Sequence, residues 1–188
     1  MSSLRACLGL AFLVAAGTGC AHATIQPGHR GLLFDPSGGG LQHEVLMPGT
    51  HKIGMSARVE DFDVTYSTQH EKLGAITVEG LSLELEVAVI YRPVVSELYQ
   101  LETEIGPSYY DEVIGPEARS TVRGVVARTS FTKLVPGCAE VEDAIETDLR
   151  RRTAGKHVEI ASVVVERLDL PKEVAEAMRR RVEARLQP

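Results

Sequence analysis

Residues 81–93, LSLELEVAVIYRP, carry the clearest hydrophobic period in this chain. Apolar side chains occupy every second position from 81 to 91, and polar side chains such as Glu84 and Glu86 stand between them. Because side chains alternate between the two faces of a strand, this period predicts a long β-strand with one buried face and one wet face. Pro93 lacks the N–H that a sheet ladder needs, so we expect the strand to end there.

The residues before this strand read as shorter strands joined by turns. Strands are expected at 32–34, 45–47 and 62–66, and turns rich in glycine or proline at 37–40 and 47–51. The early part of the domain is therefore predicted to be a largely antiparallel meander.

After Pro93 the hydrophobic period changes from 2 to about 3.6 residues. Helices are predicted over 94–104, 109–126 and 138–153, with Pro116 as the N-terminal start or a kink of the second. Strands followed by helices favour an α+β domain, here a largely antiparallel sheet with packed helices and a short C-terminal helix.

A last strand and a last helix complete the predicted order. The strand spans 158–168, and one face of it is expected to carry Val158, Ile160, Val164 and Leu168. Leu170 and Pro171 then break the pattern, and an amphipathic helix is predicted over 172–186.

Composition excludes several classes of protein. A chain of 188 residues suits one domain, and 44% hydrophobic with 24% charged residues argues against a disordered chain or a polytopic membrane protein. The net charge of −6 has the wrong sign for a nucleic-acid partner. With no Trp and 5% aromatic residues, base-stacking platforms are also poorly supplied.

The N-terminus has the form of an export signal over residues 1–19. Arg5 precedes an uncharged apolar stretch at 6–19, which would span only about 21 Å as a helix, less than the ~30 Å hydrocarbon core of a bilayer. The stretch ends in Gly-Thr-Gly-Cys at 17–20, which resembles the lipobox of bacterial lipoproteins. This resemblance predicts a lipidated Cys20 that anchors the chain to a membrane of the bacterial cell envelope, on its periplasmic or outer side.

Two other fates of the N-terminus stay open. Residues 21–23, Ala-His-Ala, fit ordinary signal-peptidase cleavage after Ala23, which would release a soluble periplasmic protein. The apolar stretch could also stay attached as an uncleaved anchor. In either lipoprotein or anchor form, residues 20–29 are expected to form a polar tether, followed by the folded domain at 30–171.

No catalytic or metal-binding motif is found in the sequence. The six histidines are scattered without the His-Glu-x-x-His spacing of a zinc site. His43 and Glu44 are adjacent, and neighbours in a strand point to opposite faces. Cys138 stands alone after Pro136 and Gly137, which is typical of a turn. We therefore predict no catalytic residues, no metal and no cofactor.

The last predicted helix carries the candidate interaction residues. Its apolar stripe has a spacing of four residues and consists of Val174, Met178, Val182 and Leu186. A basic cluster lies beside it and consists of Arg179, Arg180, Arg181 and Arg185. The stripe could pack on its own domain or form a self-association or partner surface, and the arginines could contact anionic lipid.

Several short motifs together point to a known family. They are 30–35, 48–51 (Pro-Gly-Thr-His), 91–93 (Tyr-Arg-Pro), 105–106 with Tyr109 and Tyr110, 113–123, and 168–171 (Leu-Asp-Leu-Pro). In order and spacing, residues 28–186 resemble the SPFH or band 7 superfamily of stomatins, prohibitins and flotillins, and they look most like the prohibitin branch.

This resemblance implies a non-enzymatic, membrane-attached scaffold. Family members form large homo- or hetero-oligomers, organise membrane microdomains and restrain membrane proteases. Arg119, Arg123 and Arg128 fall at family positions on the second helix, where they could serve subunit contacts or only the solvent face. The alternatives are a soluble periplasmic adaptor that binds a longer SPFH protein or a protease, and an enzyme of unrecognised type.

The chain departs from the family pattern at both ends. A lipobox-like signal stands where relatives usually have a membrane segment or hairpin. The segment 172–188 stands where relatives continue into a long coiled coil, and it is interpreted as a truncated stub of that coil. We therefore expect a monomer, a small oligomer or an accessory of a longer relative rather than a large cage.

Overall fold

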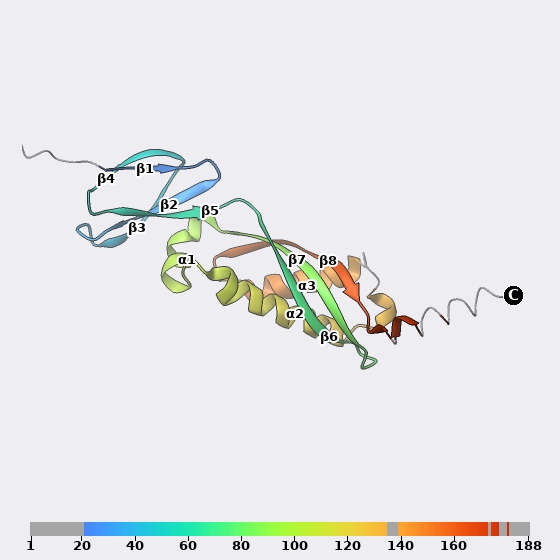
Figure 1. Cartoon of the computed structure of the whole chain (residues 1–188). Helices are drawn as coiled ribbons and strands as arrows, with labels where there is room; N and C mark the ends of the chain where they lie inside the picture. Colours follow the sequence, from blue (N-terminus) through green and yellow to red (C-terminus); the bar gives the residue numbers. More distant parts are fainter. Residues whose placement is uncertain (1–20, 135–138, 173, 177–179, 181–188) are drawn as a thin grey trace, which may run out of the picture.

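The computed structural model describes residues 21–134, 139–172, 174–176 and 180. The described chain is an α+β structure with antiparallel strands, as predicted, and these strands form three separate sheets (Figure 1). Two small sheets lie at one end of an elongated molecule, and a larger sheet with its helices forms the rest (Figure 1).

The two small sheets are built from the first five strands. One pairs β1 (Ala21–Ile25) with β4 (Gly49–Ile53). The other has the order β3-β2-β5, from β3 (Gly40–Leu46), β2 (His29–Asp35) and β5 (Arg58–Asp63). Leu32 and Phe62 bury their side chains between this sheet and the first helix.

Strand β1 lies in the segment 20–29, for which the sequence predicts a tether. Ala21 pairs with Ile53 at one end of the ladder and Ile25 pairs with Gly49 at the other. Ile25 is only 3% exposed. The pairing partner is more than 20 residues away, so a short polar run that looks like a tether in isolation becomes part of the folded domain.

Strand β5 ends earlier than the predicted strand 62–66. The Asp63 carboxylate accepts hydrogen bonds from the backbone N–H and the hydroxyl of Thr65, at 2.8 and 2.7 Å. Such an Asx turn stops a strand. Tyr66, which belongs to the expected strand 62–66, lies beyond the end of β5 and is 51% exposed.

The main sheet has the order β6-β7-β8 and contains the predicted long strand at its centre. Its strands are β6 (Ser67–Ile76), β7 (Ser82–Pro93) and β8 (Val158–Asp169). The predicted alternation of β7 is confirmed, because Leu83, Leu85, Val87 and Val89 are each at most 2% exposed.

The predicted face of β8 is wrong at one position. Val163 is 3% exposed and Val164 is 39% exposed, although the simple alternation placed Val164 with the core. The register between β7 and β8 shifts twice, between Glu86 and Val87 and between Ile90 and Tyr91. Each such bulge inserts one residue and exchanges the faces of the residues beyond it.

The helices lie where the 3.6-residue period predicts them. A 3₁₀ turn (Val95–Glu97) leads into α1 (Leu98–Glu104), and the π-helical turn η2 (Tyr110–Ile114) leads into α2 (Gly115–Ala127). A further 3₁₀ turn (Phe131–Lys133) precedes α3 (Ala139–Thr153). Pro116 occupies the first turn of α2, directly after η2, and its fixed φ suits that helical position.

Among the described residues, two hydrophobic clusters hold the fold together. The larger one packs α2 and α3 against one face of the main sheet, with residues such as Val87, Val122 and Ile145 fully buried. The smaller one packs Leu98 and Leu101 of α1 against the N-terminal strands. Within the described residues, no helix combines the length and the apolar character needed to cross a bilayer.

Candidate functional site on the open face of the sheet

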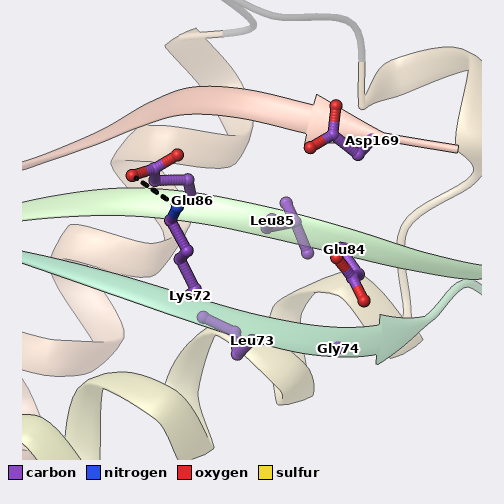
Figure 2. A pocket seen from close by; sticks show the side chains of 7 residues that line it. All are labelled: Lys72, Leu73, Gly74, Glu84, Leu85, Glu86 and Asp169. Atoms are coloured by element: carbon purple, nitrogen blue, oxygen red, sulfur yellow. Dashed lines mark ion pairs between the residues drawn. The ribbon is translucent and has the colours of Figure 1, made fainter.

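The main sheet has one face that no helix of the described residues covers. Alternation along β6 and β7 sends Leu73 and Leu85 toward α2 and α3, and sends Lys72, Glu84 and Glu86 to the opposite side (Figure 2). We call this side the open face. It carries the one group of three possible metal-ligating side chains found among the described residues, so we treat it as the candidate site.

A shallow hollow interrupts the open face beside Gly74. A Cβ at Gly74 would meet nothing within 4 Å, so the missing side chain leaves space above the strand. Glu84 is the register partner of Gly74 on one side and of Asp169 on the other. Like charges opposite each other on paired strands are destabilising, so the pairing of Glu84 with Asp169 does not add to the stability of the sheet. The hollow is lined by Lys72, Leu73, Gly74, Glu84, Leu85, Glu86 and Asp169 (Figure 2).

A second group of charged residues lies one row further along the same face. His70 Nδ1 is 2.8 Å from the Glu166 carboxylate. Lys72 Nζ is 3.6 Å from Glu86, which is a loose ion pair (Figure 2). One coordinating atom each of His70, Glu86 and Glu166 lies within 4.8 Å of the others. The sheet thus brings together three groups that are up to 96 residues apart in sequence.

A third group closes the far end of the open face. Arg92 donates to Glu159 at 2.8 Å, and its guanidinium lies 4.4 Å from the centre of the Tyr66 ring. The hydrogen bond from Arg92 to Glu159 raises the pKa of Arg92. Tyr66 donates its hydroxyl to the same carboxylate at 3.2 Å. These residues satisfy one another, so we interpret them as structural.

The covered face of the sheet holds the most buried ion pair of the site region. Arg119 of α2 donates to both oxygens of Glu71 at 3.0 Å, and the Tyr110 hydroxyl donates to Glu71 at 2.9 Å. The Glu71 side chain is 13% exposed. Burial, and then the hydrogen bond to Glu71, raise the pKa of Tyr110. A Cβ on Gly115 would lie 3.1 to 3.3 Å from atoms of these three residues, so the glycine lets them meet.

The three arginines at family positions on or just after α2 all have partners within the chain. Arg119 pairs with Glu71, Arg123 donates to the Gly74 carbonyl at 3.2 Å, and Arg128 donates to Asp148 at 2.6 Å. These contacts join α2 to β6 and α3. The arginines therefore stabilise the packing of the domain, a role that the sequence alone did not indicate.

Most residues of the C-terminal stripe and basic cluster lie outside the described part of the chain. Val174 and Arg180 are described: Val174 is partly buried, and Arg180 is 3.9 Å from Glu176, four residues earlier. Cys20 and the other stripe and cluster residues are outside the described ranges, namely Met178, Val182, Leu186, Arg179, Arg181 and Arg185.

Sequence reasoning missed the grouping of His70, Glu86 and Glu166. His43, which it did consider, stacks on Tyr99 with ring centroids 3.5 Å apart. The only signal in the sequence concerned Glu86, which stands on the polar side of the alternating strand 81–93, whereas residues 67–72 around His70 are polar throughout. The register of the sheet, and not the spacing in the chain, brings them together with Glu166.

Comparison with known proteins finds one family and its prohibitin members. The family model for the SPFH domain / Band 7 family matches residues 23–187. Mouse (Mus musculus) prohibitin 1 is 27% identical over 172 residues, which cover 90% of this chain and 63% of the relative. Prohibitin-2 of Xenopus tropicalis is 23% identical over 163 residues, which cover 82% of this chain and 52% of the relative. The mitochondrial prohibitin-7 of Arabidopsis thaliana is 24% identical over 185 residues, which cover 95% of this chain and 66% of the relative. The chain thus spans less than two thirds of the mouse relative's length.

Proposed function

The chain belongs to the SPFH domain / Band 7 family, and on that premise we propose that it is a membrane-associated, non-enzymatic scaffold or regulator. Its task would be to organise membrane proteins or to modulate a membrane protease, through assembly with itself or with longer family members. The family membership supports the scaffold class. The position of strand β1 supports the way in which the scaffold reaches the membrane.

Strand β1 bears on which N-terminus the mature protein has. It begins at Ala21, the residue after Cys20. Cleavage after Ala23 would remove three of its five ladder positions, which pair with Ile53, Lys52 and His51. Cleavage before Cys20 would leave the strand whole. The fold therefore favours a chain that starts at Cys20 over one that starts at Thr24, and we propose that Cys20 is lipidated.

This N-terminus would place the domain directly on the membrane. With Cys20 next to a paired strand, the acyl chains and the β1-β4 sheet would be separated by almost no chain. Acyl chains add about 0.8 kcal/mol of membrane affinity per buried methylene, and more than one chain gives stable attachment. Such an anchor would hold the sheet close to the lipid headgroups of the cell envelope, on the periplasmic or outer side.

The contacts of the proposed scaffold are assigned to the C-terminal segment. We propose that Val174, Met178, Val182 and Leu186 form a self-association or partner surface, and that Arg179, Arg180, Arg181 and Arg185 face anionic lipid. An apolar stripe with a basic flank suits a helix that packs on another helix close to a negative membrane surface.

The first experiment is the intact mass of the protein from membrane and soluble fractions of its host. The wild-type chain is compared with Cys20→Ala. A membrane-bound species that starts at Cys20 with a diacylglycerol-sized addition, lost in the variant, supports the lipid-anchored scaffold. An unmodified soluble species that starts at Thr24 would overturn the anchor and leave the periplasmic adaptor as the better account.

A second measurement separates the scaffold from the adaptor. Light scattering on purified protein gives the mass of the assembly, and Val182→Asp places a charge in the apolar stripe. We expect the wild type to self-associate and the variant to lose mass. A monomeric wild-type protein would instead favour an adaptor that needs a longer partner.

A further inference from the structure

Three neighbouring strands each present one metal-ligating side chain at the same level of the open face. His70 comes from β6, Glu86 from β7 and Glu166 from β8, and one coordinating atom of each lies within 4.8 Å of the others. Side chains on strands are better fixed than side chains on loops, which suits a site that must hold a defined geometry.

A small residue on the central strand allows side chains of the two outer strands to meet. Backbones of β6 and β8 are about 9.6 Å apart, twice the usual strand spacing. Ala88 lies between them as the register partner of both His70 and Val164. Because the Ala88 side chain is only a methyl group, the His70 imidazole and the Glu166 carboxylate meet across it at 2.8 Å. Ala88 is accordingly 4% exposed, although no helix in the described part of the chain lies over this face.

A β-bulge brings Glu166 into this group. Arg167 pairs with Glu86 and Val165 pairs with Val87, so Glu166 is the extra residue between two register positions. Bulges redirect side chains, and they recur where a sheet must aim a residue at a site. In this sheet the redirected carboxylate faces His70 and the Glu86 side chain.

From this convergence we propose that His70, Glu86 and Glu166 bind a divalent transition metal ion, with Zn²⁺ as the probe. Imidazole nitrogen and carboxylate oxygen are ordinary zinc ligands. Around a tetrahedral Zn²⁺ the ligand atoms lie about 3.3 Å apart, given metal–ligand distances near 2.0–2.1 Å. His70 and Glu166 are exposed and Glu86 is partly buried, so small side-chain rotations bring their ligand atoms, which lie at most 4.8 Å apart, to that separation. The fourth position is open to water.

The donor set also sets the selectivity of the site. Mg²⁺ and Ca²⁺ prefer six or more oxygen ligands, and this group supplies one nitrogen and two carboxylates. We therefore expect Zn²⁺ to bind at concentrations at which Mg²⁺ and Ca²⁺ have no effect. The proposal does not depend on the scaffold function, and either can fail without the other.

Lys72 gives the proposal a sharper test than the loss of a ligand. Its ammonium group, 3.6 Å from Glu86, competes with a cation for that carboxylate. Lys72→Met removes this competing charge and keeps a side chain of similar length. The variant is expected to bind Zn²⁺ at least about threefold more tightly, because two like charges a few ångströms apart at a surface repel each other appreciably.

The experiment is a calorimetric titration of the purified full chain with Zn²⁺, repeated with His70→Gln, Glu86→Gln and Glu166→Gln. Each variant is expected to weaken binding about tenfold or more. His43→Gln, which removes a histidine that stacks on Tyr99 outside the group, is the matched control and should bind like the wild type. At a hundredfold excess of Zn²⁺ over Kd, the Tm of the wild type should rise by about 5–10 °C.

The possible results separate clearly. Weakened binding in the three ligand variants, unchanged binding in His43→Gln and tighter binding in Lys72→Met support the site. No binding to the wild type, or binding that survives His70→Gln, overturns it. Circular dichroism reports whether each variant folds, and the three ligand variants test the same site independently if one of them does not.

Discussion

At the scale of single residues, the ion pairs of this protein differ chiefly in burial. Glu71 is 13% exposed and receives Arg119 and Tyr110 together, whereas the Arg128 side chain, which pairs with Asp148, is 60% exposed. Exposed pairs contribute little to stability because water and salt screen them. A buried carboxylate that loses its partner is left with an uncompensated charge.

We therefore expect Arg119→Met to lower the free energy of unfolding by about 2 kcal/mol or more, a value reduced from that of fully buried pairs because Arg119 is itself partly exposed. Arg128→Met is the matched control and should cost less than about 1 kcal/mol. Urea unfolding followed by circular dichroism measures both. Equal losses in the two variants would show that burial of Glu71 does not set the energy of its pair.

His157 combines backbone strain with two carboxylate partners. Its φ of 61° is unusual for a residue with a side chain. Its two ring nitrogens lie 2.9 Å from Glu97 and 3.2 Å from Glu104. Burial alone would lower the pKa of His157, but the hydrogen bonds to Glu97 and Glu104 outweigh it, and the pKa lies above its ordinary value of 6.5.

The sign of the pH effect follows from this shift. A histidine whose pKa is higher in the folded state stabilises the fold fully below about pH 6.5, and the contribution is lost as pH rises through the folded pKa. His157→Asn tolerates the same backbone conformation and has no charge to titrate. We expect the variant to lose stability at pH 5.5 and to show a flatter pH dependence between pH 6 and 8.

The control for this prediction is His22→Asn, which changes an exposed histidine of β1. Thermal unfolding across the pH range should give parallel curves for this control and the wild type. A His157→Asn curve that also runs parallel to the wild type would contradict the assigned role of His157.

At the scale of elements, the first strand sets a limit on where the chain can be cut. A protein that starts at Thr24 keeps only two of the five ladder positions of β1, although it keeps the buried Ile25. We expect this protein to have a lower Tm than one that starts at residue 20 with Cys20→Ser. The difference should be several degrees, since about 1 kcal/mol changes Tm by 2–4 °C in a chain of this size. Identical Tm values would remove the structural argument for a mature N-terminus at Cys20.

The same elements show how far sequence patterns reach. The β7 strand was predictable because one face of it is buried along nearly its whole length, so the period of two stands out. The faces of β8 were not, because two bulges depend on the pairing with β7 and leave no local signature. Strand β1 was missed for a similar reason, since its strand character comes from β4.

The candidate site was harder to predict than the fold. Residues His70, Glu86 and Glu166 follow no motif, since their meeting depends on the register of three strands and on the small size of Ala88. The π-helical turn before α2 was equally hard to predict. Pro116 indicates the start of a helix, but it does not indicate the extra residue in the preceding turn. Local propensity fixes elements, whereas pairing and packing decide which side chains meet.

At the scale of the whole molecule, two hydrophobic clusters are joined by a narrow region. Tyr109 and Val158 pack against both the large cluster under the main sheet and the small cluster around α1. The Tyr109 ring meets Tyr91 edge to face, with centroids 6.1 Å apart. Burial raises the pKa of Tyr109 to about 12, which agrees with its place between the clusters.

Removal of the Tyr109 ring should weaken the contact between the two clusters more than it weakens the packing within either cluster. We expect Tyr109→Ala to cost about 2–3 kcal/mol, below the range for a fully buried aromatic residue because Tyr109 is only partly buried. Hydrogen exchange should then become faster in α1, whose apolar residues belong to the small cluster, while β7 keeps its protection. Tyr66→Ala, which removes a ring that is 51% exposed, is the control. If α1 and β7 lost protection equally in Tyr109→Ala, the two clusters would be a single cooperative unit, and Tyr109 would be one core residue among many.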